Sequence, residues 1–246
     1  MDGDIAIVGG GIGGLTAANA LAARGFRPRV YEAAPELRTI GAGIWVPPNA
    51  MQVLARLGLA DAVAAEGSPI RTAELRDAKA GVLQRADLFY AEREFGYPTV
   101  AIHRGRLQRV LVDHLPADVV HTGRACTGVE ARGDSVLIRF EGGDTAEAPL
   151  VIGADGLRSA VRRSIFPEIP LRYSGQTSWR GVVSHVLPRE LGGTGWEVWS
   201  ASARFGFSAI GHGQVYWYAT TDAPEGEADA PGTVSAKLRA LAAPNY

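Results

Sequence analysis

Asp4-Ile-Ala-Ile-Val8 runs directly into Gly9-Gly-Gly11-Ile12-Gly13-Gly14 near the start of the chain. The first of these segments is almost entirely apolar, as in a buried strand, and the glycines that follow suit a tight turn into a helix. Leu15 to Arg24 continues that helix, and a second short strand, Arg29-Val30-Tyr31, is followed by Glu32. The opening of the chain therefore predicts a strand, a glycine turn, a helix and a second strand that ends at an acid.

This arrangement is the G-x-G-x-x-G pattern of dinucleotide-binding folds, with an acid about twenty residues further on. Gly9 permits the turn, Gly11 lets the backbone approach a pyrophosphate, and Gly14 lets the helix pack closely on the strand. The free amides at the start of the helix carry roughly half a positive charge, which favours a diphosphate there. Glu32 would accept hydrogen bonds from an adenosine ribose and repel a 2′-phosphate, so the site favours FAD or NAD over NADP. The alternative is a glycine turn that only makes a tight corner.

The length, charge and cysteine content of the chain exclude several classes of protein and of binding partner. The 246 residues suffice for one large domain or two smaller ones. Lys and Arg number 25 against 26 Asp and Glu, so the charge gives no reason to expect a nucleic acid or an anionic membrane as partner. The single cysteine, Cys126, excludes a disulfide framework and suits a reducing cytoplasm. With no signal peptide or apolar span in the sequence, we expect a cytoplasmic protein without stable membrane insertion.

The middle of the chain contains two predicted loops and one predicted helix. Gly41 to Asn49 reads as an ordered loop, with Asn49 capping a helix that ends at Gly58, and residues 89–98 read as a second loop. His103 opens an amphipathic helix. Arg104 lies in its first turn, where the helix dipole disfavours a cation, so an anionic ligand would explain it, although exposed arginines are common there.

Further strands are predicted around Cys126, at Ser135 to Phe140 and at Leu150 to Gly153. Cys126 is expected to be a small packed residue, because no neighbour would activate its thiol. The last strand leads into Ala154-Asp155-Gly-Leu-Arg-Ser159, where Ser159 caps a helix. Ligands bind at the carboxyl ends of strands in open α/β sheets, so Asp155 is predicted to face a nucleotide; turn formation alone is the alternative.

These segments together resemble the single-component FAD-dependent aromatic hydroxylases of the para-hydroxybenzoate hydroxylase family. The resemblance rests on the opening motif, on His103-Arg104-x-x-Leu107 and on Gly153-Ala-Asp-Gly-Leu-Arg-Ser-x-Val-Arg162, and it is greatest to the salicylate, 3-hydroxybenzoate and urate hydroxylase branch. It spans residues 4 to about 220. It implies an α/β fold, in which a Rossmann-like FAD-binding domain with a mainly parallel sheet is joined to an antiparallel substrate-binding sheet.

The resemblance also implies roles for single residues. The pyrophosphate would lie on the glycine turn, the adenosine ribose on Glu32, the adenine side on the backbone of Cys126, and the flavin on the loop that contains Gly43. Arg104 would contact the phosphate or ribityl region, and Asp155 would serve the pyrophosphate and the path of NAD(P)H. The full set of predicted cofactor-binding residues is Gly9, Gly11, Ile12, Gly13, Gly14, Glu32, Gly43, Arg104, Cys126 and Asp155.

Composition changes after Ile169, since four of the five tryptophans lie between residues 179 and 217 among short alternating segments. These predict an antiparallel sheet, and the resemblance places an aromatic substrate between such a sheet and the flavin. Arg180 and Tyr218 are the predicted substrate contacts, although the aromatic residues would equally build an ordinary core. The predicted division is an FAD-binding domain at 1–169, a substrate-binding sheet at 170–222, and a loop with the start of a truncated helix at 223–246.

The implied reaction consumes NADH or NADPH and O2, and hydroxylates a small aromatic or heteroaromatic substrate through a flavin C4a-hydroperoxide. No side chain is assigned to catalysis and no metal is expected. The family's Gly-Asp-Ala-Ala-His segment is not found in these residues, so a partial, non-catalytic flavoprotein is one alternative. A flavin-dependent reductase or epoxidase of the same fold is the other. The sequence leaves open the substrate, the choice between NADH and NADPH, and whether the protein is a homodimer.

Overall fold

The computed structural model describes residues 4–37, 41–77, 79–167 and 169–242, apart from the side chains of residues 240–242. Contacts within the chain divide it into two units. Unit 1 comprises Met1–Ile40, Leu57–Leu59 and Gly105–Pro170, and unit 2 comprises Gly41–Arg56, Ala60–Arg104 and Leu171–Tyr246. The chain therefore passes from unit 1 to unit 2 three times, after Ile40, Leu59 and Pro170, and returns to unit 1 at Leu57 and at Gly105.

Unit 1 is built on a four-stranded parallel sheet with the strand order β12-β1-β2-β8. The central strand β1 (Ile5–Val8) pairs in parallel with β2 (Pro28–Tyr31) on one side and with β12 (Leu150–Gly153) on the other. The short β8 (Val120–His121) extends the sheet beyond β2. All four residues of β1 are buried, as expected for the centre of a parallel sheet. The predicted parallel sheet is confirmed.

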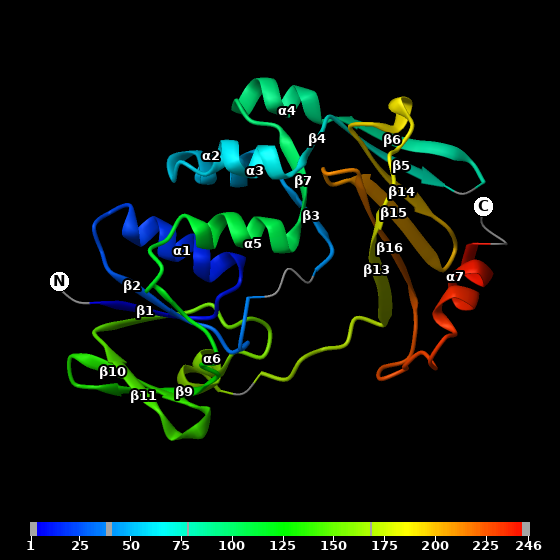
Figure 1. The fold of residues 1–246 in the computed structure, drawn as a ribbon. Coiled ribbons are helices and arrows are strands. Elements are labelled where there is room, and N and C mark those ends of the chain that lie inside the picture. Colours follow the sequence, from blue (N-terminus) through cyan, green and yellow to red (C-terminus); the bar gives the residue numbers. More distant parts are fainter. Residues whose placement is uncertain (1–3, 38–40, 78, 168, 243–246) are drawn as a thin grey trace. The chain divides into compact units, whose positions relative to one another are not determined.

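Helices α1 (Ile12–Ala22) and α5 (Arg104–Asp113) run side by side beside this sheet (Figure 1). Asn19 joins them within unit 1: its buried amide donates to the carbonyl of Leu111 at 2.9 Å and to that of Leu15 at 2.8 Å. Helix α5 begins at Arg104, because His103 is the last residue of the preceding strand and does not open the helix as predicted.

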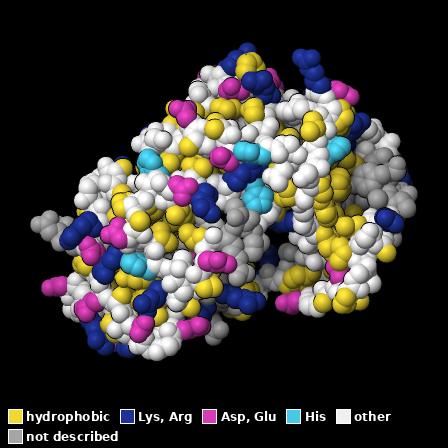
Figure 2. All heavy atoms as spheres, viewed as in Figure 1, with side chains coloured by type: hydrophobic (Ala, Val, Ile, Leu, Met, Phe, Trp, Pro, Cys, Tyr) yellow, Lys and Arg dark blue, Asp and Glu magenta, His cyan; other side chains and the backbone are white. Residues whose placement is uncertain are grey.

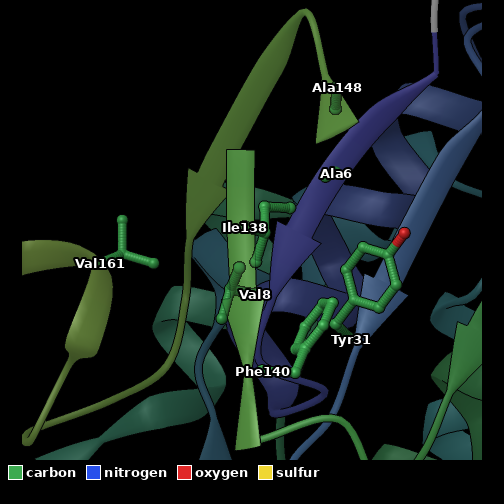
Figure 3. Close-up of a cluster of buried hydrophobic side chains, with 7 residues drawn as sticks. All are labelled: Ala6, Val8, Tyr31, Ile138, Phe140, Ala148 and Val161. Carbon is green, nitrogen blue, oxygen red and sulfur yellow. The ribbon is translucent and has the colours of Figure 1, made fainter. Parts of the chain in front are cut away.

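A three-stranded antiparallel sheet completes unit 1, with the strand order β11-β10-β9. The strands are β9 (Cys126–Arg132), β10 (Ser135–Phe140) and β11 (Thr145–Ala148); a short 3₁₀ turn at Glu141–Gly143 joins the last two, and α6 (Ala160–Ile165) follows β12. Figure 3 shows side chains of this sheet meeting those of the parallel sheet, with the rings of Tyr31 and Phe140 adjacent at 4.9 Å between centroids. The antiparallel sheet thus covers one face of the parallel one.

Unit 2 is built on a six-stranded sheet with the strand order β13-β16-β15-β14-β5-β6. Its strands are β5 (Thr72–Asp77), β6 (Gly81–Asp87), β13 (Gln176–Ser184), β14 (Thr194–Trp199), β15 (Ala203–Ala209) and β16 (Gln214–Asp222). Four of these strands confirm the predicted antiparallel sheet. The sequence did not predict that β5 and β6 join it, through a parallel pairing of β5 with β14.

The remaining elements of unit 2 are a three-stranded sheet, four helices and a 3₁₀ turn. The smaller sheet has the order β3-β7-β4, and η2 is the 3₁₀ turn. The elements are β3 (Gly43–Val46), α2 (Pro48–Arg56), α3 (Ala60–Glu66), β4 (Ser68–Ile70), α4 (Leu88–Phe95), β7 (Thr99–His103), η2 (Arg189–Leu191) and α7 (Val234–Ala242).

Both predicted loops of the middle region are wrong in part. Residues 43–46 form β3 because they pair with β7, a partner nearly sixty residues away that local patterns do not reveal. Asn49 does not cap α2, since the helix begins at Pro48 and the carbonyl of Pro47 accepts from the amides of Ala50 and Met51. Proline suits this first helical position because its missing N–H would have no helical partner.

Most of the second predicted loop, residues 89–98, is helix α4. Asp87 precedes it, and its carboxylate accepts from the amides of Phe89 at 2.9 Å and Tyr90 at 3.2 Å. Gly96 ends the helix in a left-handed conformation with φ of 79°. Both ends therefore carry ordinary capping signals, which the surrounding aromatic residues obscured.

The structure also differs from the predicted division of the chain. The passage from unit 1 to unit 2 lies between Pro170 and Leu171, close to the predicted boundary after Ile169, but residues 41–56 and 60–104 group with unit 2. Of the predicted last segment, helix α7 is described to Ala242, and residues 243–246 lie outside the described residues.

The surface shows charges of both signs. In Figure 2, Lys and Arg side chains are interspersed with Asp and Glu side chains on the face shown. None of the described helices has both the length and the apolar character that crossing a membrane requires.

Candidate functional site

The glycine turn leaves the first amides of α1 without partners among the residues that the structure describes. Gly11 is the residue before the helix, with φ of −73° and ψ of 178°, and no side chain caps the helix. The first backbone bond of the turn is donated by the amide of Leu15 to the carbonyl of Gly11 at 3.0 Å. The amides of Ile12, Gly13 and Gly14 are therefore the unpaired first amides of the helix, where an anion can bind.

Two glycines of the motif are required by packing. Gly9 has φ of 110°, and a Cβ there would lie 2.3 Å from the carbonyl oxygen of Ala154. A Cβ on Gly14 would lie 1.9 Å from the carbonyl oxygen of Gly9. Both positions bring backbone segments closer than any side chain allows.

Gly11 and Gly13 have no such neighbour. A Cβ on either residue would meet no protein atom within 4 Å, and the φ of Gly11 suits any residue. None of the described residues therefore requires glycine at these positions. A diphosphate held against the backbone would explain both, which is the fit expected for a dinucleotide.

Glu32 lies at the mouth of the glycine turn, as predicted. Its Oε2 accepts from the amide of Gly10 at 2.6 Å, and its Oε1 accepts from the amide of Ala34 at 2.9 Å. Each oxygen keeps a free lone pair, so the carboxylate can still accept from a ligand hydroxyl group. Its orientation is therefore fixed by two backbone bonds.

Gly9, Gly11 and Glu32 border a cavity of about 320 Å³ in unit 1. The same cavity is lined by Cys126 and Asp155, so five of the predicted cofactor residues lie around one space. Ile12, Gly13 and Gly14 follow in the first turn of α1. Three arginines also line the cavity, namely Arg124, Arg158 and Arg163. Arg124 and Arg163 were not predicted, because only the fold brings them here.

Cys126 and Asp155 both have structural partners in this cavity. The thiol of Cys126 donates weakly to the carbonyl of Gly128 at 3.6 Å, and burial raises its pKa, so it stays a neutral thiol as predicted. Asp155 Oδ2 accepts from the amides of Ala160 and Val161 at 2.7 and 3.2 Å, and its Oδ1 accepts from the hydroxyl of Ser159 at 2.5 Å. Its carboxylate thus caps α6 together with Ser159, and a contact with a cofactor stays a prediction.

Unit 2 contains a larger cavity of about 500 Å³, within the usual size range of small-molecule sites. One face of the six-stranded sheet and strand β3 form it. Most of its lining is apolar or aromatic; the residues are Gly43, Ile44, Trp45, Ala73, Glu74, Leu75, Gln84, Ala86, Gly195, Trp196, Glu197, Trp199, Phe207, Ser208, Tyr216 and Tyr218. We call this cavity the aromatic pocket.

Three glycines make room for the rings of the aromatic pocket. A Cβ on Gly43 would lie 2.4 Å from Tyr216, one on Gly195 would lie 2.0 Å from Trp45, and one on Gly206 would lie 2.4 Å from Tyr218. The rings therefore lie flat on the sheet instead of standing up from it. Trp45 is also fixed by its Nε1, which donates to the Ser208 hydroxyl at 3.1 Å.

Gly206 lies between Tyr218 and Glu197 in the register of strands β16, β15 and β14. Because Gly206 has no side chain, Tyr218 reaches across it, and its hydroxyl donates to Oε2 of Glu197. The indole Nε1 of Trp199 donates to Oε1 of the same carboxylate. Burial, followed by the bond to Glu197, raises the pKa of Tyr218 far above its ordinary value, so this phenol is neutral.

The two predicted substrate residues differ in position. Tyr218 lines the aromatic pocket, whereas Arg180 is exposed on β13 opposite Tyr218 in the register and does not line the cavity. Gly43 begins β3 and packs on Tyr216. Arg104 belongs to unit 2 and is exposed at the start of α5, with its amide donating to the carbonyl of Ala42. Contacts of Gly43 and Arg104 with FAD stay predictions.

Glu197 was missed from the sequence. An acid in an alternating strand looks like an ordinary solvent-facing residue, and only the register shows that it meets Tyr218. The recurring Gly next to aromatic residues, as in Phe205-Gly206-Phe207, is the one local signal that marks room for a ring on the sheet.

The sequence matches a family of known domains over almost its whole length. Residues 2–241 match the model of the FAD binding domain family. Among curated proteins, the chain is 41% identical over 229 residues to aurachin C monooxygenase/isomerase of Stigmatella aurantiaca, covering 92% of this chain and 59% of that protein. It is 46% identical over 187 residues to 3-amino-4-hydroxybenzoate 2-monooxygenase of Streptomyces cremeus, covering 75% of this chain and 47% of that protein.

The fold also matches solved structures. The structure of Klebsiella pneumoniae HpxO complexed with FAD and uric acid superposes with a TM-score of 0.87 at 31% identity, covering 96% of this chain and 61% of that one. This chain thus spans about half to three fifths of the length of these relatives.

Proposed function

Because the chain belongs to the FAD binding domain family, we propose that the protein is an FAD-dependent monooxygenase that hydroxylates a small aromatic or heteroaromatic ring. NADH or NADPH supplies the electrons, and O2 supplies the oxygen atom. The proposal concerns the whole protein, as the named relatives are longer than this chain. The observation that carries it is the cavity at the glycine turn, where Gly11 and Gly13 leave room for a ligand against bare amides beside Glu32.

The residues of unit 1 suit the nucleotide half of FAD. The free amides at the start of α1 would hold the diphosphate, and Glu32 would accept from the adenosine ribose. The backbone at Cys126 would border the adenine, and Asp155 keeps α6 directed at the same cavity. From unit 2, Arg104 would contact the phosphate or ribityl region and Gly43 would face the flavin. When bound, FAD supplies electron transfer from the nicotinamide and activation of O2 for insertion of one oxygen atom into the ring.

The residues of unit 2 would bind and orient the ring. The flat aromatic side chains of the aromatic pocket offer stacking surfaces and exclude water from the reacting carbon. Tyr218 is a neutral phenol whose proton is held toward Glu197, so its oxygen can accept a hydrogen bond from the substrate. The chain thus positions the ring, while the redox chemistry belongs to the cofactor.

The test begins with the visible spectrum of the purified protein, before and after addition of excess FAD and desalting. We expect flavin absorption bands at one FAD per chain, and NAD(P)H consumption that rises when a phenol or hydroxylated pyridine is added. With isotope-labelled O2, one labelled oxygen atom should enter the product. A protein that retains no flavin after reconstitution, or that oxidises NAD(P)H without hydroxylating any ring in the panel, would contradict the proposal.

A further inference from the structure

The charged residues in the described lining of the aromatic pocket are Glu74 and Glu197, and that lining includes no Lys, Arg or His. Their side chains point to opposite faces of the sheet, because Glu74 pairs with Trp196 in the register and Glu197 is the next residue of that strand. The two acids differ in their surroundings, and only one of them is available to a ligand.

Glu74 forms ion pairs with two arginines, Arg85 and Arg76. It is 4% exposed, and its Oε2 accepts from Nη2 and Nε of Arg85 at 2.6 and 3.0 Å. Its Oε1 lies 3.6 Å from Nη1 of Arg76. Because both oxygens face guanidinium groups, this carboxylate is already paired within the chain and is not free to bind a ligand.

Glu197 takes part in none of the described ion pairs. Its partners are the phenol of Tyr218 and the indole of Trp199, which are neutral donors. Two cations lie on the same face of the sheet without lining the cavity. Arg204 has its guanidinium over the ring of Trp199, 5.2 Å from the centroid, and Arg180 lies opposite Tyr218 on β13. Each carboxylate oxygen of Glu197 therefore has a second lone pair at the pocket wall that can accept from a further donor.

We infer that Glu197 and Tyr218 select substrates that present an N–H donor, such as an amino-substituted or nitrogen-heterocyclic ring, and reject rings that carry a free carboxylate. This inference rests on the proposed function and specifies its substrate class. A ring amine or ring N–H would donate to the free lone pairs of Glu197 and Tyr218. A ligand carboxylate would instead meet a like charge without a lining cation to balance it.

A movement of Arg204 could produce the opposite preference, for rings that carry a carboxylate, and the experiment has to distinguish the two cases. If Arg204 turned from Trp199 into the aromatic pocket, it would pair with a substrate carboxylate and reverse the selection. The two routes predict opposite orders of affinity for ligands that share a ring and a hydroxyl group.

The test measures binding of 3-aminophenol and of 3-hydroxybenzoate by quenching of the intrinsic fluorescence of Trp45 and Trp199, whose indole nitrogens bond to Ser208 and Glu197 in the pocket. This readout needs neither FAD nor turnover, so a failed inference is distinguishable from a failed proposal of monooxygenase activity. The wild-type protein is expected to bind 3-aminophenol at least about tenfold more tightly than 3-hydroxybenzoate, which is the order of effect of one net hydrogen bond. Equal affinities, the reverse order, or no binding of either ligand would overturn the inference.

Variants then assign the preference to the carboxylate. Glu197→Gln keeps the size and an acceptor oxygen but removes the charge, and it should reduce the preference to within about threefold. Glu190→Gln, at an exposed position of η2, is the matched control and should bind as the wild type does. A preference retained in Glu197→Gln would overturn the role of this residue. If that variant does not fold, the order of affinities in the wild type remains the deciding measurement.

Discussion

Gly11 and Gly14 lie three residues apart in one motif, yet they meet opposite surroundings. A Cβ on Gly14 would collide with the backbone of Gly9, whereas a Cβ on Gly11 would enter open space. One glycine is therefore required by the folded chain, and the other is explained by a ligand. Substitutions at these two glycines can therefore distinguish an effect on folding from an effect on ligand binding.

Gly11→Ala should leave the protein folded and weaken FAD binding. The added methyl group strains no backbone angle and meets no protein atom, so the cost in unfolding free energy should stay below about 1 kcal/mol. The same methyl group would stand between a diphosphate and the amides, and FAD affinity should fall at least about tenfold, or about 1.4 kcal/mol. Flavin fluorescence titration and a thermal melt measure the two effects.

Gly14→Ala is the matched comparison at the same motif. Its Cβ would lie 1.9 Å from a backbone oxygen, so α1 must shift and the protein should lose about 1–3 kcal/mol of unfolding free energy. If Gly11→Ala destabilised the protein as much as Gly14→Ala, the space beside Gly11 would not be a ligand site.

The elements show where sequence patterns suffice and where they fail. Strand β1, helix α1 and Glu32 follow from local residues, because apolar runs, glycine turns and strand ends act over a few neighbours. The resemblance to FAD-dependent aromatic hydroxylases is confirmed by the family match and by the named relatives. Strand β3 was missed because its partner β7 is distant in sequence, and the role of Glu197 was missed because three strands must align before Tyr218 reaches it.

Helix α4 illustrates a local signal that can be tested. Asp87→Ala removes the acceptor for the amides of Phe89 and Tyr90, and it should cost about 1 kcal/mol of unfolding free energy. Urea denaturation measures the change, and hydrogen exchange should show faster opening within residues 88–95. The exposed Asp118→Ala serves as control and should stay within about 0.5 kcal/mol of the wild type. An equal effect of both variants would argue against the cap.

Helix α7 is attached through charged groups, so its docking should depend on pH. Asp229 accepts from Nε1 of Trp179 at 2.5 Å, and Lys237 reaches Asp229 at 3.2 Å and Glu227 at 2.7 Å. The bond from Trp179, with Lys237, lowers the pKa of Asp229 below its ordinary 3.8, while Glu227 and Asp229 raise the pKa of Lys237 above its ordinary 10.5. The contribution of Asp229 is thus complete above pH 3.8 and lost as the pH falls through its lower folded pKa.

For Lys237 the sign is reversed, since a raised pKa gives a contribution that is complete below pH 10.5 and lost as the pH rises through its folded pKa. Protection of α7 against proteolysis or hydrogen exchange should therefore be constant between these limits and fall outside them. Asp229→Asn should abolish the acid limb of the profile. An unchanged acid limb in that variant would assign the pH dependence to another group.

At the scale of the whole molecule, the two candidate ligand sites belong to different units. FAD should slow hydrogen exchange at the glycine turn, residues 9–14, and around Glu32 and Asp155. An N–H-bearing ring should instead protect residues 195–199 and 216–218. Mass spectrometry of exchange with each ligand alone measures the two patterns, at about 100 times the dissociation constant, where binding stabilises by about 2.7 kcal/mol. Protection of residues 9–14 by the ring alone, or equal protection of residues 195–199 and 216–218 by FAD alone, would contradict this assignment.

The parallel pairing of β5 with β14 joins segments more than a hundred residues apart. During synthesis on the ribosome, β5 and β6 emerge long before β14, and β5 must wait with one edge of its backbone unpaired. When β12 completes the parallel sheet of unit 1, β14 has not yet been synthesised. An unpaired strand edge can form hydrogen bonds with another chain or be bound by a chaperone. Charged residues along β5, including Glu74 and Arg76, disfavour pairing with another nascent chain.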